Sequence, residues 1–494
     1  MRRHRAKVAV LAATLAATGC GTDRDPTPPA LTRPPAQTVT VLDGDPAELA
    51  VAMSRVLYER APAVVLADES DPASWVAAAK AATELGVPLL LTPSPEREDG
   101  DEVRGAGADG GSGGSAEVAA MVDSEVERLA PTTVLTFGGG VEPADLPRLT
   151  RPRPLETVTV IAQELESTTA ALATARAAGA RVLTTTTADP RTDPELIAAL
   201  SQRPPTHTVA LGAGFGPAER LAGRLEVAVT GVQLPGGGQV VFPGRRLVAL
   251  YGHPGNTALG ALGEQGLAAT VERATRLAGE YQSLVDEPVV PAFEIITTIA
   301  SASAGPAGDY SRRTPVEDLW PWIDAAREAG IYVVLDLQPG HTDFLTQARE
   351  YEELLREPHV GLALDPEWRL APGQRHMVQI GSVDTAEVNQ VVTWLADLTD
   401  RYDLPQKLLV IHQFTLTMIT NRADLDTSRD ELAIMIHADG FGTPGQKHET
   451  WRALHVDAPD VWWGWKNFYD EDQPTLTPAE TVAVEPSPRF ISYQ

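Results

Sequence analysis

The sequence predicts an α/β protein in two parts: a duplicated Rossmann/flavodoxin-like parallel α/β region, followed by a (β/α)8 TIM-like barrel. Along most of the chain, short apolar runs alternate with stretches of helical apolar spacing, which is the pattern of parallel strands joined by crossover helices. In the second half, eight such runs fall within about 250 residues, the usual size of a closed barrel. A chain of 494 residues is also too long for one ordinary domain, and 43% hydrophobic residues can fill two sizeable cores.

The first 20 residues carry the pattern of a secretory signal peptide. A basic start precedes an apolar stretch at 8–17, which is too short to cross a membrane because a span needs about 20 residues. Thr18 and Gly19 precede Cys20, the only cysteine of the chain, and this arrangement resembles a bacterial lipobox. The resemblance implies lipidation at Cys20, which would hold the chain at the extracytoplasmic face of the cell membrane. The alternative is an ordinary cleaved signal peptide with an incidental cysteine.

The segment at 21–37 is rich in proline and threonine and predicts a disordered tether, because it cannot build a core. The strands expected next lie at 39–42, 63–67 and 87–92, and the helices between them at 47–58 and 73–85. An insert at 104–115 contains six glycines and predicts a flexible surface loop.

Two similar segments, 131–140 and 205–214, each run from a strand into glycines, so the region 38–240 predicts a duplicated strand–helix unit. The stretches 64–67, Asp71, 77–79, 86–92 and 134–139 resemble the bacterial cell-wall-binding repeat family (type 2). Members of that family use α/β repeats to hold surface proteins on anionic wall polymers. The resemblance implies wall binding by this region. A structural or interdomain role is the alternative, because arginine and lysine are not clustered here.

After a junction at 240–246, the barrel is expected to occupy residues 245–494. Its predicted strands lie at 247–251, 289–296, 331–337, 361–364, 407–411, 432–436, 461–465 and 490–493. Its predicted helices lie at 258–284, 316–329, 344–355 and 385–402.

Nearly every predicted barrel strand ends in an acid, a histidine, an amide, a lysine or an aromatic residue. In a parallel barrel these carboxyl ends meet at one mouth, where active sites of such barrels lie. Four acids are therefore the candidate catalytic residues: Asp365, Glu367, Asp336 and Glu294. Glycoside hydrolysis needs one acid that donates a proton to the leaving oxygen and one ionised carboxylate that acts as nucleophile or base. Each acid taken alone has a structural alternative, a helix N-cap or a loop salt bridge.

The candidate substrate-binding residues at the same mouth are His253, Gln338, His412, Gln413, His437, Asp439, Lys466, Tyr251 and Trp368. His412, His437 and Asp439 could also ligate a metal, but they lack a tight His-x-His or His-x-x-x-His spacing, so neither a metal nor another cofactor is expected. The chain has no Gly-x-Ser-x-Gly elbow for serine chemistry. The glycines at 212–216 lack the downstream acid of a dinucleotide fingerprint.

A net charge of −27 argues against nucleic acid as a partner, because neutralising phosphates requires clustered lysine and arginine. The sequence therefore predicts a surface-anchored cell-envelope protein that hydrolyses an envelope glycan. Its partners would be that polysaccharide and, through the anchor at Cys20, the membrane. The alternative is a non-catalytic wall-binding lipoprotein whose barrel binds a carbohydrate. The hydrolase interpretation requires the carboxylates of Asp336, Asp365 and Glu367 to face a shared cleft.

Overall fold

The computed structural model describes residues 28–93, 112–138, 143–163 and 165–494. They form two compact units, which are described separately below. The first comprises the described residues within Met1–Ala36, Gly44–Val158 and Leu165–Val182, and the second comprises those within Gln37–Asp43, Thr159–Glu164 and Leu183–Gln494. The predicted signal peptide 1–20, with Cys20, and most of the predicted loop 104–115 lie outside the described residues. Within the described part of the chain, no helix combines the length and the apolar character that crossing a membrane requires.

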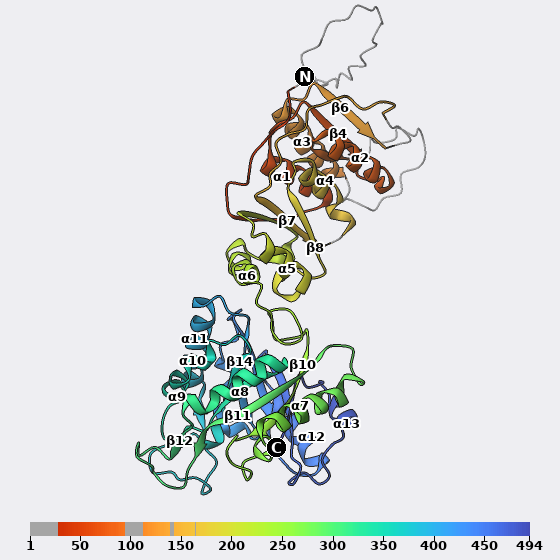
Figure 1. Ribbon diagram of the computed structural model, residues 1–494. Helices are drawn as coiled ribbons and strands as arrows, with labels where there is room; N and C mark the ends of the chain where they lie inside the picture. The colour runs from red at the N-terminus through yellow and green to blue at the C-terminus, as the bar shows by residue number, and fades with distance from the viewer. Residues whose placement is uncertain (1–27, 94–111, 139–142, 164) are drawn as a thin grey trace, which may run out of the picture. The chain divides into compact units, whose positions relative to one another are not determined.

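The first unit is built on a three-stranded parallel sheet of order β5-β4-β6 (Figure 1). These strands are β4 Ala63–Asp68, β5 Leu89–Thr92 and β6 Thr133–Phe137, and the helices are α1 Pro46–Leu57, α2 Pro72–Leu85, α3 Ser112–Leu129 and α4 Thr169–Ala177. The core is rich in alanine and leucine, with Trp75 and Phe137 as its largest side chains. Asp45 caps α1 in a capping box with Glu48.

The prediction of a disordered tether is wrong for the described residues 28–37. β1 (Leu31–Thr32) pairs antiparallel with β3 (Tyr58–Arg60), and the Arg33 amide donates to the Leu57 carbonyl at 2.9 Å. Ala30 is buried. Pro35 is buried as well. A short pairing, with a register shift between Leu31 and Thr32, and these two buried side chains hold the segment in place, although its proline content indicated the opposite.

A second sheet has four strands in the order β2-β9-β7-β8. They are β2 Val39–Leu42, β7 Val158–Gln163, β8 Arg181–Thr185 and β9 His207–Leu211. The helix α5 Pro194–Gln202 lies between β8 and β9, and α6 Ala218–Thr230 follows β9. β2 and β9 pair in parallel although the sequence separates them widely. The predicted α/β character with parallel strands is confirmed.

The remainder of the second unit is a closed barrel of eight parallel strands, drawn from green to blue in Figure 1. Its strands are β10 Arg246–Gly252, β11 Val289–Ala300, β13 Tyr332–Leu337, β14 Val360–Leu364, β16 Lys407–Gln413, β18 Leu432–Ala438, β19 Trp462–Asn467 and β20 Phe490–Tyr493. Each of the eight predicted strands is present, and the TIM-like barrel is confirmed. A short strand, β12 (Ser311–Arg313), adds antiparallel to β11.

The barrel helices are α7 Leu267–Gln282, α8 Val316–Ala329, α9 Phe344–Glu350, α10 Glu352–Leu355, α11 Thr385–Arg401, α12 Pro444–His455 and α13 Pro478–Val482. The predicted helix 258–284 is wrong in its first third, because α7 begins only at Leu267. Gly260 has φ +89°, and a Cβ atom at Gly263 would lie 2.2 Å from the His253 carbonyl oxygen. The chain therefore turns closely over the end of β10 before the helix starts.

Alternation along the strands separates two cores. One set of side chains packs against the helices. The other set points into the barrel and includes Leu247 and Ala249 of β10, Tyr332 and Val334 of β13, and Met435 of β18. Side chains on one face of a strand recur every second residue. The residue two positions after the last apolar inner residue of each strand therefore also points into the barrel. That position lies at the carboxyl end of the barrel.

Candidate active site

At the carboxyl end of each of the eight strands, this inward-facing position carries a polar side chain. These side chains are Tyr251, Glu294, Asp336, Asp365, His412, His437, Lys466 and Ser492, and all are buried. Strand pairing sets Tyr251 beside Glu294, His412 beside His437 and Lys466 beside Ser492. The apolar layers of the lower barrel are thus followed by a complete polar layer.

A cavity of about 590 Å³ borders this layer. Six of the predicted site residues line it: Tyr251, Gln338, Glu367, Trp368, Asp439 and Lys466. Apolar side chains, among them Phe414, Phe441 and Phe468, form much of the remaining wall. The cavity therefore combines three carboxyl groups (those of Glu367, Asp439 and Glu471), a lysine and a tyrosine with an aromatic lining.

One branch of the polar layer centres on Tyr251. Its hydroxyl donates to Asp336 Oδ2 at 2.9 Å and accepts from Gln338 Nε2 at 3.3 Å. The Lys466 ammonium group lies 3.5 Å from the centre of the Tyr251 ring, a cation–π contact that fixes the lysine at the cavity wall.

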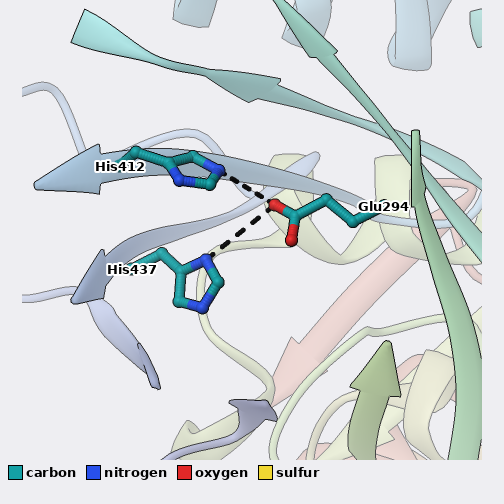
Figure 2. Close-up of side chains that lie close together, drawn as sticks. All are labelled: Glu294, His412 and His437. Atoms are coloured by element: carbon teal, nitrogen blue, oxygen red, sulfur yellow. Dashed lines mark hydrogen bonds and ion pairs between the residues drawn. The ribbon is translucent and has the colours of Figure 1, made fainter. Parts of the chain in front are cut away.

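The other branch centres on His412. Its Nδ1 lies 2.9 Å from Asp439 Oδ2, and its Nε2 lies 2.9 Å from Glu294 Oε1. His437 Nδ1 lies 3.8 Å from the same Glu294 oxygen. Figure 2 shows the two imidazole rings and the Glu294 carboxylate converging on one point. On its outer side, His437 Nε2 lies 3.3 Å from Ser492 Oγ.

Several atoms of this layer have no hydrogen-bond partner among the described residues. They are Glu294 Oε2, Asp336 Oδ1, Asp365 Oδ1, His437 Nδ1 and Asp439 Oδ1, all fully buried. Buried polar atoms are nearly always paired, so a group of unpaired ones indicates a missing ligand, ion or water.

Burial controls the protonation of the carboxyl groups. Burial and the nearby Asp439 charge raise the pKa of Glu367 to about 7. Burial raises the pKa of Asp336 to about 6, and burial and Glu367 raise the pKa of Asp365 well above its usual range. For Asp439, burial acts to raise the pKa, but the hydrogen bond and charge of His412 outweigh it, and the pKa is lowered.

For Glu294 and the two histidines too, burial and the neighbouring charges shift the pKa in opposite directions. Burial acts to raise the pKa of Glu294, but the His412 charge and hydrogen bond lower it. Burial acts to lower the pKa of His412, but Glu294 and Asp439 raise it well above 6.5. For His437, burial dominates and lowers the pKa to about 3, so this imidazole is neutral.

Not every predicted residue joins the site. His253 Nε2 lies 3.1 Å from Thr314 Oγ1, and Gln413 accepts a hydrogen bond from Arg422 in the interior. Neither lines the cavity. The expectation that Asp336, Asp365 and Glu367 face a shared cleft is wrong, because Glu367 lines the cavity whereas Asp336 and Asp365 lie in the buried layer. A hydrolase that uses these three acids together is therefore excluded, and Glu367 would need another carboxyl group of the cavity as its partner.

Sequence reasoning missed several residues of this region, among them Phe414, Phe468 and Ser492. Phe414 and Phe468 line the cavity, and Ser492 contacts His437. The signal for Ser492 was present, because it follows the buried Phe490 by two residues on the last strand. The two phenylalanines follow strand ends directly, but nothing in their spacing separates a cavity wall from ordinary core.

Comparisons of the chain with protein families, with curated proteins and with solved structures gave no match. The functional argument therefore depends on the barrel and its polar layer.

Proposed function

We propose that the barrel hydrolyses a glycosidic bond, with Glu367 as the general acid and Asp439 as the nucleophile or base. The observation that carries this proposal is that these two carboxyl side chains, from the segments after β14 and β18, line one cavity. Paired carboxyl groups beside the scissile bond are the usual machinery of glycoside hydrolysis.

The two acids have different surroundings, which supports different roles. Asp439 is hydrogen-bonded to His412, so its ionised form is stabilised and it can attack the anomeric carbon or take a proton from water. Burial and the Asp439 charge raise the pKa of Glu367 to about 7, so this carboxyl group is mostly protonated below that pH. It can therefore donate its proton to the leaving oxygen.

The other cavity residues suit a sugar substrate. Trp368 and Phe441 offer aromatic faces, against which the apolar face of a sugar ring can pack. Gln338 and Lys466 offer hydrogen-bond donors for hydroxyl groups.

We further propose that the protein works at the cell envelope. The lipobox-like end at Cys20 supports a lipid anchor, and the resemblance of 38–240 to cell-wall-binding repeats supports a duplicated region that binds wall polymer. The substrate would then be a polysaccharide of the same envelope.

The test is incubation of the purified full chain with fractionated envelope polysaccharides, followed by measurement of released reducing ends. Wild-type protein should release sugar, whereas Glu367→Gln and Asp439→Asn should bind the same fraction without turnover. If wild-type protein binds a fraction but releases nothing from any of them, the barrel is a carbohydrate-binding module and the hydrolase proposal is wrong.

A further inference from the structure

We propose that the polar layer holds one divalent transition-metal ion, bound by a Glu294 carboxylate oxygen, His412 Nε2 and His437 Nδ1. One ligand atom from each of these residues lies within 4.8 Å of the other two, and all three side chains are completely buried. Figure 2 shows one nitrogen of each imidazole facing the same oxygen of Glu294. They come from β11, β16 and β18.

The outer hydrogen bonds of both histidines orient the inner nitrogens for metal binding. With its proton on Nδ1, His412 donates to Asp439 Oδ2 at 2.9 Å and keeps a lone pair on Nε2. With its proton on Nε2, His437 can donate to Ser492 Oγ at 3.3 Å and keeps a lone pair on Nδ1. Metal-binding histidines are characteristically held in this way, with the second nitrogen donating to a carboxylate or another oxygen.

Those tautomers create a conflict that a cation resolves. Neutral His412 presents a lone pair to Glu294 Oε1 at 2.9 Å, and His437 presents another at 3.8 Å. Lone pairs that face a carboxylate repel it unless a cation or a proton lies between them. His437 Nδ1 and Glu294 Oε2 also have no hydrogen-bond partner in the described part of the chain.

The wider charge balance points the same way. Five buried or half-buried carboxyl groups meet here: Glu294, Asp336, Asp365, Glu367 and Asp439. Among the described residues, the compensating charges within the layer are Lys466, its only lysine, and His412 when that imidazole is protonated. Burying unpaired carboxylates is costly, and a divalent ion would neutralise two of these charges at the point where the carboxylate and the imidazoles meet.

The donor set indicates the kind of metal. Two imidazole nitrogens with one carboxylate suit Zn²⁺, Fe²⁺ or Co²⁺, whereas Mg²⁺ and Ca²⁺ prefer oxygen ligands. A second possible set, Asp365, His412 and Asp439, contains one nitrogen only.

The metal site goes beyond the proposed hydrolysis and does not depend on it. A protein that hydrolyses no glycan can still bind the ion, and a hydrolase can work through Glu367 and Asp439 without it. Binding is therefore measured directly rather than through turnover.

The experiment treats the purified full chain with a chelator, removes the chelator and titrates Zn²⁺ by calorimetry. Wild-type protein should bind one Zn²⁺ per chain. Substitution of a metal's outer hydrogen-bond partner typically costs about 10–100-fold in affinity, so loss of a direct ligand in Glu294→Gln or His437→Gln should cost about a hundredfold or more. His455→Gln changes a histidine on α12 outside the layer and should bind as wild type does.

Cobalt provides a second readout that needs no variant. Co²⁺ added to the chelated wild-type protein should produce the visible d–d absorption of nitrogen and oxygen coordination, and Zn²⁺ should abolish it. If the two ligand variants do not fold, this spectrum and the binding stoichiometry decide the question. The proposal is overturned if wild-type protein binds no stoichiometric metal, or if folded Glu294→Gln and His437→Gln bind it with unchanged affinity. In either case a protonated His412, paired with Glu294, occupies the place assigned to the ion.

Discussion

His412 Nε2 lies 2.9 Å from Glu294 Oε1, although 118 residues separate the two along the chain. The contact exists because β11 and β16 belong to one closed barrel and deliver these side chains to the same buried layer. His412 also joins this layer to the cavity, since its other nitrogen contacts Asp439, which lines the cavity wall.

Removing either proposed catalytic group should abolish most turnover while leaving binding intact. General acid catalysis contributes about 10²–10⁴-fold, so Glu367→Gln should lower kcat by about that factor, and Asp439→Asn should be at least as damaging. Glu449→Gln, on the exposed side of α12, serves as the control. Equal kcat for Glu367→Gln and wild type would remove Glu367 from the mechanism.

The pH profile should show a loss of activity on the alkaline side. A general acid must be protonated, and burial with the Asp439 charge places the pKa of Glu367 at about 7. For a polysaccharide substrate, kcat/KM should fall about tenfold for each step of one in pH once the pH exceeds about 7. An activated aryl glycoside, whose leaving group needs no proton, should lack this fall. A fall of the same size for both substrates would assign the titration to another group.

The stability of the barrel should rise with pH between about 7 and 10 because the pKa of Lys407 is lowered in the folded protein. Its ammonium nitrogen is buried beneath β16 and donates to the carbonyl groups of Glu357 and Val360 at 2.9 Å. Burial lowers its pKa from 10.5 to about 7. Between these values the unfolded chain binds a proton that the folded chain does not, so the free energy of unfolding rises with pH across this window.

The measurement is urea unfolding at several pH values between about 7 and 10, with tryptophan fluorescence as the signal. Eight of the nine tryptophans lie in residues 245–494, so the signal reports mainly on the barrel. A tenfold change in a proton-binding constant corresponds to about 1.4 kcal/mol, so the free energy of unfolding should rise by about that amount for each step of one in pH. Lys407→Met should flatten the dependence, and a pH dependence identical to that of wild type would show that Lys407 does not cause it.

Gly464 should be indispensable to the polar layer. A Cβ atom there would lie 2.8 Å from His437 Cδ2 and 3.0 Å from Met435 Sδ. Gly464→Ala should therefore destabilise the barrel by about 1–3 kcal/mol through overpacking and should weaken Zn²⁺ binding by displacing the His437 ring. Gly445→Ala has open space around the new methyl group and should do neither. Thermal unfolding and zinc calorimetry on both variants provide the test.

Cys20 should determine membrane attachment. In a bacterial host, wild-type protein should incorporate labelled palmitate and partition into the membrane fraction, because buried acyl CH₂ groups each contribute about 0.8 kcal/mol. Cys20→Ser should carry no label and should be released from the membrane, whereas Thr22→Ala should behave as wild type. Label in the Cys20→Ser protein would contradict lipidation at this position.

The barrel strands could be predicted because their signal is local. A run such as 361–364 is buried on both faces in a parallel barrel, so it is apolar throughout and short. α8 was predicted with its observed bounds for a similar reason, since helical apolar spacing and Gly330 mark its course and its end. α12 and α13 were missed although Thr443 and Thr477 each begin a capping box, because their apolar stripes are weak.

The sequence by itself determined that polar residues follow the apolar strand runs, and that Asp365, His412 and His437 lie at one end of the barrel. Only the tertiary structure decided their depth and their partners. Glu367 and Asp439 reach the cavity while Asp336 and Asp365 stay below it, and His412 faces Glu294 rather than its neighbours in sequence. The physical reason is that the two properties depend on different parts of the chain. Alternation along one strand fixes which face a side chain takes, whereas its contacts across the barrel depend on the closure and stagger of all eight strands.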